Sequence, residues 1–71
     1  MVMIAVFKTS VRYSAEAMML KSGLDTLSTQ WNFDLSDCDK ILRVKIRHES
    51  DVEMIRTVLL RAGFVCEELP D

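Results

Sequence analysis

Alternating apolar and polar positions predict four β-strands, which cover residues 2–8, 31–35, 40–48 and 64–69. The first has apolar side chains on both faces, so we expect a central strand that is covered on both sides or meets a partner on its second face. In the third strand, apolar positions alternate with Arg43, Lys45 and Arg47, which indicates one buried face and one face in solvent. The turn at 36–39 joins the second and third strands into a hairpin.

Apolar residues at helical spacing predict two helices between these strands. The first follows a capping residue, Ser14, and contains Gly23, whose missing side chain indicates close packing. Its apolar stripe consists of Ala17, Leu20, Leu24 and Leu27. The second helix begins with a capping box formed by Ser50 and Glu53, and it ends at Gly63, the residue type best suited to a left-handed stop.

The predicted order of elements, β-α-β-β-α-β, defines an α+β fold class. Two right-handed crossovers place both helices on one face of a four-stranded antiparallel sheet with strand order 4-1-3-2, which is a ferredoxin-like sandwich. A chain of 71 residues forms one domain, residues 1–71. In this topology the loop after the first strand, the turn at 36–39 and Gly63 share one end of the molecule, and His48 lies at the other.

Composition and charge narrow the classes of protein that the chain can belong to. Apolar residues make up 49% of the chain and its net charge is −2, which predicts a globular protein without general attraction to nucleic acid. The longest apolar runs are too short to span a bilayer, and no signal-peptide pattern precedes the first strand. We therefore expect a cytoplasmic protein without a membrane partner, in which Cys38 and Cys66 are reduced thiols.

A strand, a hairpin, a helix, a glycine and an aromatic residue follow one another at 31–35, 41–46, 51–62, Gly63 and Phe64. In this order, and in its first helix, nearly the whole chain resembles the heavy-metal-associated family of small copper-chaperone-like βαββαβ domains. That family carries a Met-x-Cys-x-x-Cys motif, and the resemblance aligns it with Val11 (a buried anchor), Tyr13 and Glu16. Both thiolates are absent, so the resemblance implies a degenerate member that binds no metal cofactor.

The alternative is a noncanonical metal site at the hairpin turn. Its candidate ligands are Cys38, Asp37, Asp39 and Glu16. The turn and the last strand belong to opposite sides of the predicted sheet, and His48 is roughly 30 Å from Cys38 along an extended strand. The histidine and the two cysteines therefore cannot form one tetrahedral zinc site within a monomer.

Catalysis and RNA binding find little support in the sequence. The chain has one histidine, no nucleophile beside an evident base and no glycine-rich phosphate loop, so we predict a non-enzyme. RNA binding on this topology uses aromatic side chains on the central strands, and the third strand has none. The remaining function is binding to a protein partner or to a second copy, with candidate surface residues Val11, Tyr13, Trp31 and Phe64.

Overall fold

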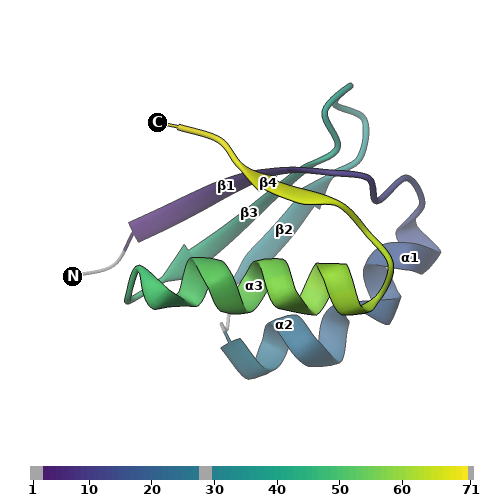
Figure 1. Cartoon of the computed structure of the whole chain (residues 1–71). Coiled ribbons are helices and arrows are strands. Elements are labelled where there is room, and N and C mark those ends of the chain that lie inside the picture. The colour runs from purple at the N-terminus through teal and green to yellow at the C-terminus, as the bar shows by residue number, and fades with distance from the viewer. Residues whose placement is uncertain (1–2, 28–29, 71) are drawn as a thin grey trace.

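The computed structural model describes residues 3–27 and 30–70, which form one layer of strands and one layer of helices (Figure 1). In chain order the elements are β1 (Met3–Thr9), α1 (Ser14–Met19), α2 (Lys21–Leu27), β2 (Trp31–Asp34), β3 (Ile41–Ile46), α3 (Ser50–Arg61) and β4 (Cys66–Glu68). The α+β class is therefore confirmed.

The four strands form a single antiparallel sheet in the order β2-β3-β1-β4. Counted from the β4 edge, the same sheet reads 4-1-3-2. Strand β1 is central, since it pairs with β3 along Met3 to Lys8 and with β4 along Phe7 to Thr9. The register places Phe7 opposite Leu42, and Phe33 lies opposite Leu42 on the other side.

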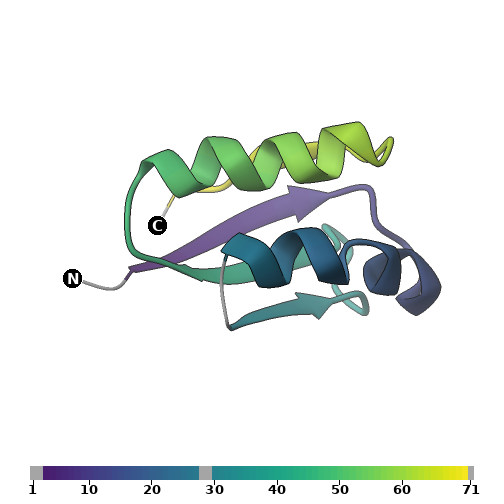
Figure 2. The ribbon, with the colours of Figure 1, turned by 90° about the horizontal axis from the view of Figure 1, so that it is seen from below.

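All three helices lie on one face of the sheet (Figure 2). Along β1 the side chains of Ala5, Phe7 and Thr9 are buried beneath them, and the intervening side chains point to the helix-free face. The buried core consists of Ala5, Phe7, Val11, Leu20, Leu24, Leu42, Val44, Ile46, Ile55, Leu59 and Cys66. Within the described residues, none of the helices has the length and apolarity needed to cross a bilayer.

The predicted first helix is wrong in one respect, because it is two helices, α1 and α2, that meet at Leu20. The Leu20 N–H bonds the carbonyl of Ala17 at 3.1 Å, three residues back, which is the tighter 3₁₀ type of turn. This turn redirects the chain (Figure 2) and buries both Leu20 and Leu24, whereas α1 itself has no buried residue. Helical spacing does not reveal the break, because Leu20 and Leu24 would share one face in a continuous helix as well.

The predicted caps at the helix starts are also wrong. Ser14 is the first residue of α1, and the Oε1 atom of Glu16 caps that helix by accepting the N–H groups of Arg12 (2.9 Å) and Tyr13 (3.2 Å).

Ser50 is likewise the first residue of α3, so it forms no capping box with Glu53. The Oδ2 atom of Asp51 instead accepts the N–H groups of Arg47 and His48, both at 3.2 Å. In both helices the carboxylate within the first turn serves the backbone that precedes the helix, which takes over the role expected of serine.

The stop after α3 and the close contact at Gly23 are both confirmed. Gly63 has a φ of +91°, and the N–H of Phe64 bonds the carbonyl of Leu59 at 2.9 Å, as a Schellman motif requires. At Gly23, an added Cβ would lie 2.8 Å from Cγ1 of Val58, so only glycine lets α2 approach α3 this closely.

Candidate functional site

Thr9 joins the loops at the hairpin end of the molecule. Its buried hydroxyl donates to the carbonyl of Lys40 at 2.7 Å and accepts the N–H of Val11 at 3.2 Å. Its own N–H bonds the carbonyl of Asp39 at 3.2 Å, so the hairpin turn reaches β1 directly. Only β1 separates the turn from Cys66, because Thr9 pairs with Cys66 on the other side.

A second set of bonds ties the same end to β4. The N–H of Ser10 bonds the carbonyl of Val65 at 3.1 Å, and the N–H of Val65 bonds Oγ of Ser10 at 2.8 Å. Together with the bonds of Thr9, these contacts confirm that the loop after β1, the hairpin turn and the segment after Gly63 share one end.

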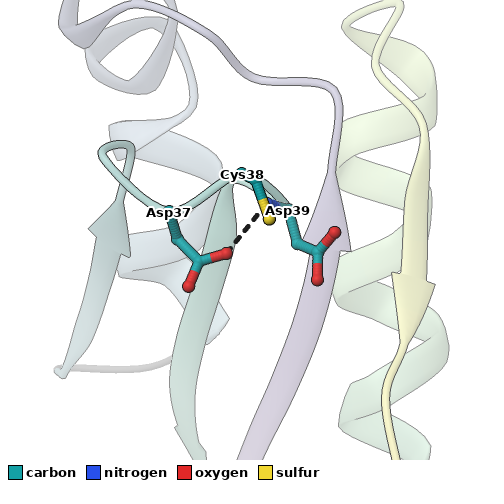
Figure 3. A group of neighbouring side chains, drawn as sticks. All are labelled: Asp37, Cys38 and Asp39. Atoms are coloured by element: carbon teal, nitrogen blue, oxygen red, sulfur yellow. Dashed lines mark hydrogen bonds between the residues drawn. The ribbon is translucent and has the colours of Figure 1, made fainter.

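The hairpin turn brings three of the predicted metal ligands together (Figure 3). The ligand atoms of Asp37, Cys38 and Asp39 all lie within 4.8 Å of one another. However, Oδ1 of Asp37 already accepts the N–H of Asp39 at 2.8 Å, and Oδ1 of Asp39 lies 3.7 Å from Nζ of Lys8. Asp37 therefore serves the turn, because its side chain satisfies the backbone two residues on, and Asp39 forms an ion pair with β1.

The fourth predicted ligand, Glu16, lies on a different element and has another task. Its carboxylate caps α1, as described above, and among the described residues it does not belong to the group at the turn.

The two cysteines are free and have opposite environments. Cys38 is exposed in the turn, whereas Cys66 is part of the core. Burial raises the pKa of the Cys66 thiol to about 11, and the charge of Arg56 only partly opposes this shift. Cys66 is consequently a protonated core residue at neutral pH and offers no thiolate to a metal.

Val11 is buried, as the resemblance implied for an anchor, so its prediction as a surface residue is wrong, whereas Tyr13 is accessible. Val11 is 0% exposed, because its N–H bond to Thr9 turns the loop so that the side chain enters the core. Tyr13 is 65% exposed at the start of α1. Phe64 is half-buried and packs against the core after the Schellman turn.

Trp31 is a structural residue that sequence reasoning assigned to the surface. Its indole N–H donates to Oδ1 of Asp25 at 2.7 Å, and Oδ2 of Asp25 accepts Nζ of Lys21 at 2.6 Å. The bonds from Lys21 and then Trp31 lower the pKa of the Asp25 carboxyl. Through its bond to Asp25, Trp31 holds β2 against α2. The ring of Phe33, on the same strand, meets the indole edge-on, with the ring centroids 6.0 Å apart.

The helix-free face of the sheet is the other candidate site. Ile4 lies near the start of β1 on this face and is 54% exposed, and the strand register places Lys45 beside it. The next position, Val6, is beside Arg43 on β3, and its carbonyl accepts the N–H of Leu69 at 2.8 Å. Apolar side chains thus border two cations, with no helix above them (Figure 1).

A shallow hollow lies on this part of the sheet. Its lining includes Ile4, Asn32, Arg43 and Lys45 of this face, and also Trp31 and Val44, whose side chains belong to the helix-covered side. Arg47, which the sequence placed in the same basic stripe, follows the end of β3, and its N–H bonds Asp51. The stripe within the strand therefore consists of Arg43 and Lys45.

The aromatic residues of the strands lie on the helix-covered side. Phe7, Phe33 and Trp31 share this side because they pair with Leu42, Leu42 and Val44, whose side chains are all buried. Within the described strands, the helix-free face therefore has no ring on which a nucleic-acid base could stack.

Comparison of the chain with known protein families, with curated proteins and with solved structures gave no match.

Proposed function

We propose that this chain is a non-enzymatic protein-binding module that uses the helix-free face of its sheet. The observation that carries the proposal is the exposure of Ile4, a large apolar side chain, on the helix-free face of β1. An antiparallel sheet often has one face in water, but polar side chains usually occupy that face. An exposed isoleucine on the open face is consistent with a partner that covers it.

Within this proposal the fold is a ferredoxin-like sandwich, resembling a heavy-metal-associated domain that has lost its two thiolates. The positions aligned with those thiolates are Tyr13 and Glu16, and Glu16 is occupied with capping α1. The exposed free thiol of Cys38 fits a reducing compartment, so we place the protein in the cytoplasm. A metal site at Asp37, Cys38 and Asp39 is the weaker alternative, because the turn and the ion pair with Lys8 account for the two aspartates.

The test is selection of extended peptides from a displayed library on the immobilised protein, followed by affinity measurements on the enriched peptides. We expect Ile4→Ser to weaken their binding about tenfold or more, since it removes the exposed apolar contact. Leu60→Ser is the matched control, because Leu60 is similarly exposed (57%) but lies on α3, on the other side of the sheet. Equal loss in the two variants, or no enriched peptide, would contradict the proposal.

A further inference from the structure

The charges on the helix-free face are separated along the strand direction, with cations toward one end and acids toward the other. The cations Arg43 and Lys45 lie beside Val6 and Ile4, toward the start of β1. The acids lie toward its end, where Asp34 pairs with Ile41 and Glu67 pairs with Lys8.

The hairpin turn adds to the acidic end. Asp39 lies 3.7 Å from Nζ of Lys8, whose side chain points to the helix-free face. In Figure 3 the carboxylates of Asp37 and Asp39 lie on the side of the strands away from the helices. One end of the face is therefore basic, the other is acidic, and the apolar side chains lie between and beside them.

We propose that a second copy of this chain is the partner that covers the helix-free face, with the strands of the two copies antiparallel. A two-fold axis that lies in the contact plane and runs across the strands brings the basic end of each copy over the acidic end of the other. Arg43 of each copy then faces the carboxylates around Asp39 of the other copy, so the contact occurs twice. This inference rests on the proposed function, because it names the occupant of the same surface.

The polarity of the face favours a second copy over a uniformly charged partner. An acidic peptide would meet Asp34, Asp39 and Glu67 at one end, and a basic peptide would meet Arg43 and Lys45 at the other. Like charges placed opposite one another weaken an interface, whereas the antiparallel dimer brings Arg43 of each copy toward the acids of the other, and Lys8 at the acidic end keeps its own ion pair with Asp39.

The size of the face sets the strength of the dimer. The four strands contain 7, 4, 6 and 3 residues, so at about 3.4 Å per residue and about 4.8 Å per strand the sheet has a footprint of roughly 330 Å². Stable interfaces bury about 800 Å² on each partner, so we expect a reversible dimer with a dissociation constant between about 10 µM and 1 mM. High salt should weaken it, since exposed charges set its register.

The experiment is sedimentation equilibrium of the full chain and of two charge-reversal variants, Arg43→Glu and Asp39→Lys. Each variant alone should dimerise at least about tenfold more weakly than the unaltered chain, because each places like charges opposite one another. An equimolar mixture of the two should regain the lost affinity, because Glu at 43 then faces Lys at 39 and the unaltered Asp39 still faces the unaltered Arg43. The hydrogen bonds of the turn survive in Asp39→Lys, since Asp39 engages in them through its backbone N–H and carbonyl.

Arg61→Glu is the matched control, because Arg61 is an exposed arginine on α3, away from the face. It should dimerise like the unaltered chain, and circular dichroism of all variants should show the same secondary structure. The inference is overturned if the unaltered chain is monomeric at about 1 mM, or if the mixture dimerises no better than its components. Peptides that still bind through Ile4 in that case would leave the proposed binding function standing.

Discussion

The two thiols of this chain should react at very different rates. Burial raises the pKa of Cys66 from 9.0 to about 11, which leaves about one hundredth of the thiolate of an unperturbed thiol. Cys38 is exposed at the hairpin turn. A thiol reagent such as 5,5′-dithiobis(2-nitrobenzoate) should therefore modify one equivalent rapidly and the second only on unfolding.

Single variants assign the two phases. Cys38→Ser should abolish the rapid phase, and Cys66→Ala should leave it unchanged. Two rapid equivalents in the folded protein would show that Cys66 is accessible.

Residue types and spacing predicted the conformation or burial of some individual residues and missed that of others. The stop at Gly63 was predictable because its cause is local: a positive φ suits glycine. Trp31 was misplaced because its environment depends on a distant contact: the partner of the indole, Asp25, lies on α2. Val11 was assigned both to the core, by the resemblance, and to the surface, and its burial agrees with the first.

The packing of α2 on α3 depends on one missing side chain. In Gly23→Ala the new Cβ would lie 2.8 Å from Val58 and force the helices apart, at a cost of about 1–3 kcal/mol. The intrinsic helix preference of alanine offsets about 1 kcal/mol of this cost, so the free energy of unfolding should fall by up to about 2 kcal/mol. Urea unfolding monitored by circular dichroism measures the difference.

A double-mutant cycle separates the two effects. In a Val58→Ala background the space for a methyl group exists, so Gly23→Ala should stabilise rather than destabilise the protein. A stabilising effect of Gly23→Ala in the unaltered background would mean that Val58 moves aside at no cost.

Element types were predictable because each strand and helix carries its own period, but element ends were not. The apolar stripe through Leu20 and Leu24 continues smoothly across the break between α1 and α2. The apolar pattern therefore does not show the break, since Leu20 and Leu24 reach the core on either side of it. The starts of α1 and α3 were shifted for a related reason, since Glu16 and Asp51 cap the preceding backbone in place of the serines.

For the molecule as a whole, stability should decrease in acid. Hydrogen bonds from Lys21 and then Trp31 lower the pKa of Asp25 below 3.8, and the hydroxyl of Ser36 is the main cause of the lowered pKa of Asp34. A carboxyl whose pKa is lower in the folded state stabilises that state above its unfolded pKa, and this contribution is lost as pH falls through the folded pKa. The melting temperature should therefore fall as the pH decreases below about 4.

Asp25→Asn tests this origin of the acid sensitivity. The variant should melt at a lower temperature than the unaltered protein at pH 7, and its melting temperature should change less below pH 4. An identical pH profile in the two proteins would assign the acid sensitivity to other groups.

The α+β class and the antiparallel sheet were predictable from the sequence because local periods and a short chain leave few arrangements. The candidate surface was only partly visible. The two apolar sides of β1 indicated that its second face is unusual, and that face is indeed uncovered at Ile4. The acidic end of the face could not be foreseen, because it depends on how the hairpin turn bonds to Thr9 and lies against β1.

The bond between Trp31 and Asp25 fixes the position of the tryptophan whose fluorescence can be measured. The chain has one tryptophan, and its indole sits at the junction of β2 with α2. Its emission therefore records whether α2 is seated on the sheet, while far-ultraviolet circular dichroism reports on the described helices together, of which α3 is the longest. Unfolding curves from the two signals coincide only if both helices leave the sheet together, so their comparison measures the cooperativity of the helical layer.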